Sequence, residues 1–350
     1  MPNRTHTADV LKGIAILFMI QVHLTELFAS YELATSSAGK VFMFLGGPPV
    51  APLFMVLFGY FISVTHKSTY QLIVRGVEIF ALGMLLNLAL NFNLIYTVWR
   101  GLLLIDILPF VFGVDILQFA GLSLIVIALL KKVLEQQLVI IVIVIITSVL
   151  LGQYLISFIP ENNFLIYVAA FFYGSAQWSY FPLFPWIAYP LIGMALYQLQ
   201  QRYQIDVTLT TKTNKALVIC ALLFLILTIG YAISIASDLP SYYHHGILFF
   251  LWVIVFLSVY SVCVHSITER IGTTRVFTYL TWLGKHVTLI YIIQWIIIGN
   301  IATEIYKSIT SPLYIALCFI GVLVASSGLG YFMLKLKIYY TNRFLVKNTN

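Results

Sequence analysis

The stretch LVIIVIVIITSVLLGQYLISFI at residues 138–159 runs for 22 positions without a charged residue. A helix needs about 20 predominantly apolar residues to cross the hydrocarbon core of a bilayer. Similar stretches recur along the whole chain: of its 350 residues, 61% are hydrophobic and 9% are charged, whereas soluble proteins carry roughly 25% charged residues. The sequence therefore predicts an all-α polytopic membrane protein and excludes a soluble domain, a disulfide-stabilised scaffold and a disordered chain.

About ten segments have the length and composition of transmembrane helices. We predict spans at residues 11–31, 43–65, 71–91, 113–130, 138–159, 181–200, 215–236, 246–268, 278–300 and 312–334. Residues 94–112 and 163–178 are also apolar, but the first carries two charges and a proline and the second is short and rich in aromatic residues. We expect these two segments to be interfacial or re-entrant, since re-entrant backbone is tolerated where it lines a cavity.

The basic residues predict the orientation of the spans. With ten spans and a cytoplasmic N-terminus, sixteen Lys and Arg residues lie on the cytoplasmic side, and only Lys40, Arg100 and Lys307 lie on the other side. Cytoplasmic loops are enriched in Lys and Arg, so we expect both termini in the cytoplasm and residues 1–350 to form a single integral-membrane domain. The same bias accounts for the net charge of +7, and we expect no nucleic-acid partner.

The first span carries three ionisable residues that stand out. Lys12 and His23 are eleven residues apart, which is about three turns, so they share one helix face at an axial separation of roughly 16 Å. Glu26 follows His23 by three residues and lies on the same face. Ionisable residues inside a span are functional candidates by default. The alternative is a snorkelling lysine and a histidine that is hydrogen-bonded to a neighbouring helix.

Two acidic or basic positions mark the ends of other spans. Arg75 begins the third span with Glu78 one turn later, a spacing that permits either a local ion pair or a cation for an anionic ligand. Asp115 begins the fourth span on the outer side. A carboxylate is stabilised near a helix N-terminus without any function, so this position alone does not decide between the two interpretations.

The ninth predicted span combines Lys285 at its cytoplasmic start with Tyr291 and Gln294 at greater depth. These residues form either a functional site or a polar packing seam between helices. The sequence contains no spacing typical of a metal site, and we expect no metal.

Six segments together resemble a known family. Residues 9–23, DVLKGIAILFMIQVH, resemble the first span of transmembrane acyltransferases, with Lys12 at the position where these proteins usually have Arg. Five further segments match motifs of the same proteins, in the same order: APLFMVLFGYFI at 51–62, Arg75–Asn87, Asp115–Gln118, FPLFPWIAYPLIGMAL at 181–196 and LGKHVTLIYIIQ at 283–294. The resemblance is stronger to the heparan-α-glucosaminide N-acetyltransferase-like group than to the related acyltransferase-3 group.

This resemblance implies an enzyme that takes an acyl group, commonly acetyl, from cytoplasmic acyl-coenzyme A. Coenzyme A carries phosphates, which cations bind through charge-assisted hydrogen bonds. Lys12, Arg75 and Lys285 are the candidates on the cytoplasmic side. Tyr291 and Gln294 are the candidates for bonding the thioester carbonyl or lining the acyl path.

The resemblance further implies that the acyl group reaches a hydroxyl or amine of a glycan or amino sugar on the extracytoplasmic side. His23 would act as a general base or carry the acyl group itself, and Glu26 or Asp115 would orient it. We expect a multi-pass protein in the plasma membrane of a bacterium or archaeon. A homo-oligomer is left open by the sequence.

Two other function classes remain compatible with the sequence. One is a transporter or flippase with a charged central site, although no internal repeat supports it. The other is a non-catalytic membrane partner whose buried charges only set helix packing. Neither requires His23 to react.

Overall fold

The computed structural model describes residues 6–65, 67–135, 137–203 and 212–347. This part of the chain is helical, and its only strand-like pairings are two isolated bridges. The helices are α1 (His6–Leu27), α2 (Tyr31–Thr35), α3 (Ser37–Gly46), α4 (Ala51–Val64), α5 (Thr69–Leu90), α6 (Phe92–Trp99), α7 (Leu108–Val111), α8 (Ile116–Leu134), α9 (Leu138–Leu155), α10 (Asn163–Ala170), α11 (Leu183–Trp186), α12 (Ala188–Tyr203), α13 (Lys212–Ala236), α14 (Leu239–Tyr243), α15 (Ile247–Ile271), α16 (Arg275–Lys285), α17 (Val287–Ile305) and α18 (Pro312–Lys347).

Within the described residues, nine helical stretches are long and apolar enough to cross a membrane. They are His6–Leu27, Ser37–Val64, Thr69–Leu90, Ile116–Leu134, Leu138–Leu155, Thr213–Ala236, Ile247–Ile271, Val287–Ile305 and Pro312–Thr341. Each corresponds to one of the predicted spans, so the prediction of an all-α polytopic membrane protein is confirmed.

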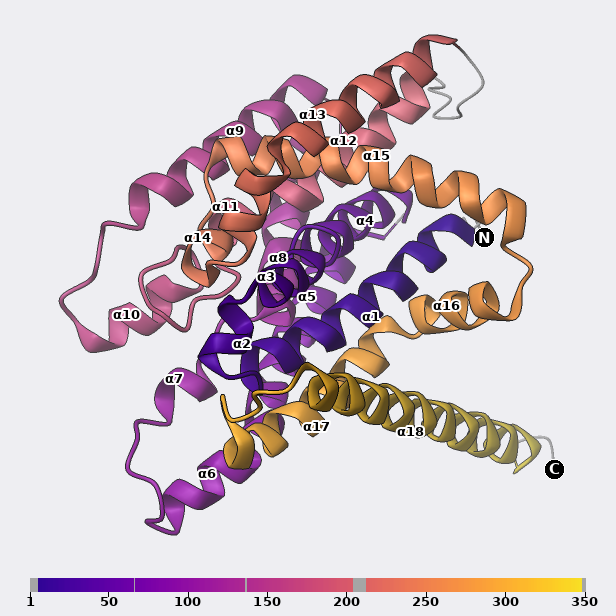
Figure 1. The fold of residues 1–350 in the computed structure, drawn as a ribbon. Coiled ribbons are helices and arrows are strands. Elements are labelled where there is room, and N and C mark those ends of the chain that lie inside the picture. The colour runs from indigo at the N-terminus through magenta and orange to yellow at the C-terminus, as the bar shows by residue number, and fades with distance from the viewer. Residues whose placement is uncertain (1–5, 66, 136, 204–211, 348–350) are drawn as a thin grey trace.

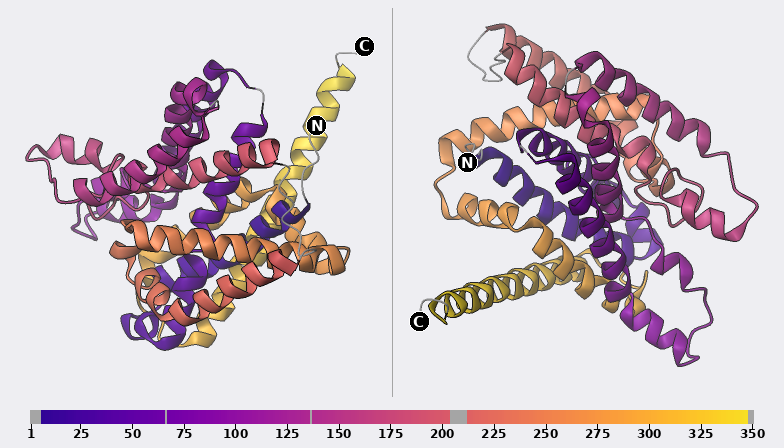
Figure 2. Two further views of the ribbon diagram at one scale, coloured as in Figure 1. Left: turned by 90° about the horizontal axis from the view of Figure 1, so that it is seen from above. Right: turned by 180° about the vertical axis from the view of Figure 1, so that it is seen from behind.

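The remaining predicted span, the sixth at residues 181–200, is broken into α11 and α12. Phe184 adopts extended backbone angles between Leu183 and Pro185, because a proline removes a helical donor and disfavours helical angles in the residue before it. The remaining helix α12 has 16 residues. Both ends of the described chain lie on the same side of the bundle (Figures 1 and 2), which requires an even number of crossings. The pair α11–α12 therefore completes the tenth crossing as a broken helix.

The ninth predicted span, residues 278–300, is also interrupted, which corrects the prediction of one continuous helix. The helix α16 begins earlier, at Arg275, and ends at Lys285, and α17 begins at Val287. A Cβ added at Gly13 would lie 2.0 Å from the Leu280 carbonyl oxygen, and one at Gly284 would lie 1.9 Å from the Asp9 carbonyl oxygen. Only glycine lets α1 and α16 approach this closely, so Lys285 lies at a helix break beside the start of α1.

The two ambiguous segments do not cross the bundle. Residues 94–112 contain the end of α6 and the whole of α7, and residues 163–178 contain α10, and these helices have only four to eight residues. In Figure 1 they lie on the left, on the side away from both chain ends. Many of their apolar side chains are exposed, as expected for helices at a membrane interface.

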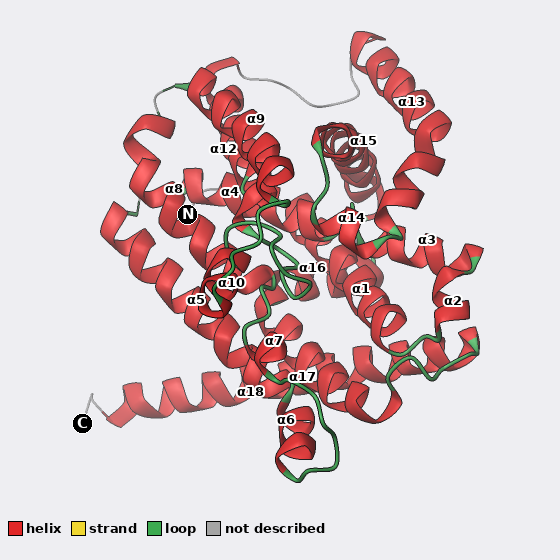
Figure 3. Cartoon of the chain, turned by 90° about the vertical axis from the view of Figure 1, so that its left-hand side faces the viewer, coloured by secondary structure: helices red, strands yellow, loops and turns green. Residues whose placement is uncertain are grey.

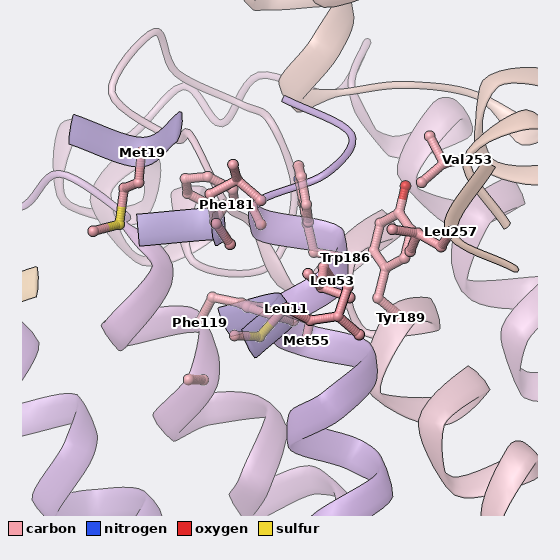
Figure 4. Packing of buried hydrophobic residues seen from close by; sticks show 14 of the residues in the cluster. Leu11, Met19, Leu53, Met55, Phe119, Phe181, Trp186, Tyr189, Val253 and Leu257 are labelled. Carbon is pink, nitrogen blue, oxygen red and sulfur yellow. The ribbon is translucent and has the colours of Figure 1, made fainter. Parts of the chain in front are cut away.

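Large aromatic side chains fill the core of the bundle next to the side that carries α6, α7 and α10. Figure 4 shows Trp186 and Tyr189 between Leu53 of α4 and Val253 of α15. Both aromatic side chains are fully buried, and their polar atoms have partners: the Trp186 indole N–H donates to the Tyr243 carbonyl oxygen at 2.8 Å. This packing ties the broken helix α11–α12 to the loop that follows α14.

Candidate active site

Loops from five parts of the chain meet at the end of α1 that carries His23. We call these residues the roof: 28–30, 114–115, 178–181, 242–245 and 306–309. Ring contacts join residues 242–245 to 178–181, since the Tyr243 ring lies 5.3 Å from the Tyr180 ring and 5.1 Å from the Phe181 ring. Backbone pairing joins 28–30 to 306–309 and 114–115 to 178–181: the Ile309 N–H donates to the Phe28 carbonyl at 2.9 Å, and the Val114 N–H donates to the Trp178 carbonyl at 2.9 Å. The Phe181 N–H donates to the Val114 carbonyl at 2.9 Å. The roof therefore covers the N-terminus of α8 and the C-terminal end of α1.

His245 fixes the part of the roof that follows α14. Its Nδ1 lies 2.7 Å from the Tyr242 carbonyl oxygen and its Nε2 lies 2.8 Å from the Tyr189 hydroxyl. A carbonyl only accepts, so Nδ1 carries the proton and the tyrosine hydroxyl donates to Nε2. Burial lowers the pKa of His245 to about 4, which keeps this imidazole neutral at physiological pH.

His23 lies beneath the roof and contacts α17 through both its edge and its face. Its Nδ1 is 3.2 Å from the Gln294 Oε1. Its ring stacks on the Trp295 indole, with 3.9 Å between centroids and an interplanar angle of 26°. Two consecutive residues of a helix that follows His23 by more than 260 positions therefore fix the orientation of this imidazole.

The hydrogen bonds of Gln294 assign the His23 tautomer. The Gln294 Nε2 donates to the Tyr291 carbonyl oxygen at 3.2 Å, so the amide oxygen is the atom that faces His23. An amide oxygen only accepts, and His23 Nδ1 must therefore carry the proton. The lone pair is left on Nε2, which is the atom able to take a proton or attack an acyl carbon.

Asp115 is held by two donors at the N-terminus of α8. The Ile116 N–H donates to one carboxylate oxygen at 2.7 Å, and the Tyr291 hydroxyl donates to the other at 2.7 Å. Asp115 is therefore a helix cap as well as a partner of α17. Tyr291 links the two halves of the site, because its carbonyl holds Gln294 and its hydroxyl holds Asp115.

Glu26 adds a second carboxylate one turn beyond His23. It lies close enough to Lys307 and Asp115 to interact electrostatically with both, and Tyr180 and Tyr243 lie within the same range. His23, Glu26 and Asp115 lie deep in the protein but keep part of their surface accessible. These three side chains are therefore only partly buried, and the exposed Tyr180 lies within electrostatic range of Glu26 and Asp115.

The structure adds contacts that the sequence did not predict. Gln294 bonds the Nδ1 of His23, and Tyr291 bonds Asp115. The expected roles of Tyr291 and Gln294 on the acyl path, and of Glu26 and Asp115 in orienting His23, stay predictions.

Lys12 marks the opposite end of α1. Its ammonium lies 2.7 Å from the Asp9 carboxylate, which is 1% exposed, and 5.8 Å from the Phe61 ring centroid. Gly284 packs against the Asp9 backbone. Lys285, the next residue in the sequence after Gly284, is exposed. The α1–α16 contact therefore places Lys12 and Lys285 at the same end of the bundle.

The Arg75 side chain contacts Glu78, and among the described residues no ion pair or hydrogen bond joins it to Lys12 or Lys285. Its guanidinium pairs with Glu78 at 2.9 Å, both side chains are 56% exposed, and α5 packs mainly against α8. This is the local ion pair that the spacing permits, and such exposed pairs contribute little.

Apolar side chains fill the stripe of α1 between Lys12 and His23. Ile16 and Met19 lie one turn apart on this stripe, and both are buried. An acyl group that moves along α1 has to displace these side chains or pass beside them. Met19 is the more adaptable of the two because its side chain is unbranched.

Comparison with known proteins adds the family. Residues 4–226 match the sequence model of the heparan-alpha-glucosaminide N-acetyltransferase catalytic domain. The chain belongs to this family. It is accordingly a membrane acetyltransferase, and this confirms the family resemblance of its motifs. No curated protein and no solved structure matches the chain.

The matched region of this acetyltransferase contains Lys12, His23, Glu26 and Asp115. Gln294 and the other α17 residues of the site lie beyond residue 226. The acetyltransferase therefore builds its candidate site from the matched region and from the C-terminal third of the chain.

Three residues of the site were not predicted from the sequence. In the sequence, Trp295 cannot be distinguished from the other apolar residues of its span, although it directly follows the candidate residue Gln294. Tyr180 belongs to a loop whose position only the tertiary structure defines. Lys307 carried a usable signal, because it is one of three basic residues predicted on the outer side.

Proposed function

We propose that this chain transfers an acetyl group from cytoplasmic acetyl-coenzyme A, through the helix bundle, to a hydroxyl or amine of an extracytoplasmic glycan. Residues 1–350 act as one unit in the plasma membrane of a bacterium or archaeon. The observation that carries the proposal is the His23–Gln294 hydrogen bond, which leaves a basic imidazole nitrogen inside a membrane span.

The donor binds where α1 and α16 touch. Lys12 and Lys285 offer two ammonium groups to the phosphates of coenzyme A, and the buried Asp9 holds Lys12 in position. Arg75 is left out of this group because its side chain pairs on the exposed face of α5. The positive-inside bias predicts that this end faces the cytoplasm.

The chemistry needs one lone pair, at His23 Nε2. The acceptor O–H or N–H gives its proton to this nitrogen as the acceptor atom attacks the thioester carbonyl carbon. The carbon–sulfur bond then breaks, and the coenzyme A thiolate takes the proton back from the imidazolium. In the covalent variant, Nε2 attacks the thioester carbon, and the carbon–sulfur bond breaks to release the coenzyme A thiolate. The acceptor atom then attacks the acetyl-imidazolium carbonyl, its proton passes to the thiolate, and the bond between the acetyl carbon and Nε2 breaks to restore the neutral imidazole.

The acceptor binds on the roof side. Glu26 and Asp115 accept hydrogen bonds from sugar hydroxyls or an ammonium group. Lys307 balances the charge of Glu26. The rings of Tyr180 and Tyr243, 5.3 Å apart, provide apolar surface for a sugar face.

The test starts from the donor, because it needs no knowledge of the acceptor. Purified protein in detergent is titrated with acetyl-coenzyme A by calorimetry, and labelled acetyl-coenzyme A is then offered with amino sugars and glycosides. We expect saturable donor binding and labelled product. Folded protein that binds no donor at millimolar concentration would refute the proposal.

A further inference from the structure

A cavity of about 610 Å³ lies between α5, α7, α8 and α10. Its walls are mainly aromatic and aliphatic, and include Phe80, Phe112, Leu122, Tyr167 and Phe171. Ligand pockets typically measure roughly 300–1,000 Å³, so the cavity has the size of a binding site. Figure 3 shows α10 and α7 beside α5 at this place.

The surroundings of the cavity indicate what can enter it. Phe164 and Phe172, which line it, are 72% and 40% exposed, and Leu108 is 45% exposed. Two candidate membrane spans, Thr69–Leu90 and Ile116–Leu134, supply the other wall. Exposed apolar side chains beside membrane spans contact lipid, so the molecules that reach this cavity are hydrocarbon chains.

The cavity shares a wall with the roof. The Tyr167 ring stacks on the Trp178 ring, with 5.0 Å between centroids, and the Trp178 carbonyl accepts from the Val114 N–H. Phe112, which contacts Tyr167 at 5.4 Å, precedes Asp115 by three residues. A molecule in the cavity therefore lies one side chain away from the segments that carry Asp115 and Tyr180.

We propose that the cavity binds the hydrocarbon chain of a lipid-linked acceptor, whose polar head carries the acetylated hydroxyl or amine under the roof. This inference rests on the proposed function, and it names the acceptor as an amphiphile. The short distance between the cavity and the roof, which share the stacked Tyr167 and Trp178 rings, favours this occupant over a bulk phospholipid, for which no contact with the acceptor side is needed.

The activity test compares dodecyl and methyl glycosides of the same amino sugar as acceptors. For an acceptor dissolved as monomer in water, burying about two methylene groups is worth about tenfold in affinity, so below its critical micelle concentration we expect a KM at least about tenfold lower for the dodecyl glycoside. Val168→Trp, at a lining residue that is 40% exposed, should abolish this preference and leave turnover of the methyl glycoside unchanged. Val142→Trp, on α9 and 44% exposed, is the matched control and should keep the preference. Equal KM values, or a Val168→Trp variant that behaves like the control, would overturn the proposal.

A binding test separates this inference from the proposed function. A photoreactive dodecyl glycoside should label peptides that contain residues 163–172, whether or not acetyl transfer occurs. Excess dodecyl glycoside should compete with the label, whereas methyl glycoside and phosphatidylglycerol should not. Equal competition by phosphatidylglycerol would show a bulk lipid site and reject the lipid-linked acceptor, while labelling without acetyl transfer would reject only the proposed function.

Discussion

The two ends of α1 hold their ionisable side chains in different ways. At one end, Lys12 pairs with Asp9 three residues earlier in the same helix. At the other end, His23 is held by Gln294 and Trp295 of α17, under a roof of loops from five parts of the chain. The ion pair with Asp9 holds the Lys12 ammonium in position beside the Phe61 ring, whereas the acceptor oxygen on α17 fixes which nitrogen of the His23 imidazole is basic. The end where a hydrogen bond fixes the tautomer is therefore the one suited to acid–base chemistry.

Removing the imidazole should have the largest effect. We expect His23→Ala to lower acetyl transfer by about 10²–10⁴-fold, the typical contribution of a general base, while donor affinity measured by calorimetry stays unchanged. His265→Ala is the matched control, because His265 sits in α15 and bonds Thr7. Equal losses of acetyl transfer in the two variants would mean that His23 has only a structural role. The two ends of α1 would then not differ in function.

Gln294 tests whether the tautomer matters. Gln294→Leu removes the acceptor for the His23 Nδ1 proton, and a lost partner costs about 1–3 kcal/mol, or roughly 5–150-fold in rate. Gln294→Glu keeps an acceptor oxygen at this place, and should retain most of the turnover that Gln294→Leu loses. A purely packing role predicts the reverse order, because leucine preserves the apolar bulk.

The roof should loosen in acid. Burial lowers the pKa of His245 from 6.5 to about 4, so below pH 6.5 the unfolded chain takes up a proton that the folded chain refuses. Stability is then lost as the pH falls from 6.5 toward 4, by about 2 kcal/mol at pH 5.

Thermal unfolding in detergent at pH 7 and pH 5 measures this effect. His245→Gln should reduce the difference in Tm between the two pH values. An unchanged difference would show that His245 does not hold the roof in its neutral form.

The donor end should give the smallest effect. Lys12→Ala removes one charge-assisted contact and should weaken coenzyme A binding by about tenfold, with less effect on turnover at saturating donor. Arg75→Ala is the comparison, because Arg75 forms an exposed local pair, and it should change binding by less than about twofold. If both substitutions weakened coenzyme A binding equally, Arg75 would belong to the donor site.

The sequence predicted the spans well and the site only in part. Long apolar runs specify helices by length alone, and nine of the ten predicted spans appear as candidate spans in the described residues. The breaks before α12 and at His286 were missed, because their cause is local backbone geometry within segments whose average hydropathy is that of a span. His23, Glu26 and Asp115 could be found because ionisable residues are costly in a membrane.

The connections between site residues could not be predicted. The hydrogen bond between Gln294 and His23 was not predicted, because the α1–α17 contact depends on the tertiary structure. Trp295 and Tyr180 gave no signal, since aromatic residues are common both in spans and at interfaces.

Acetyl transfer from one face of a membrane to the other is the direct test of passage through the bundle at His23. Oriented proteoliposomes receive labelled acetyl-coenzyme A at the face that carries Lys12, with an amino-sugar acceptor enclosed on the roof side. We expect labelled acceptor inside the vesicles with the unmodified protein and with His265→Ala, and none above background with His23→Ala. Labelled acceptor found only on the donor side, or equal labelling with His23→Ala, would contradict transfer through the bundle at His23.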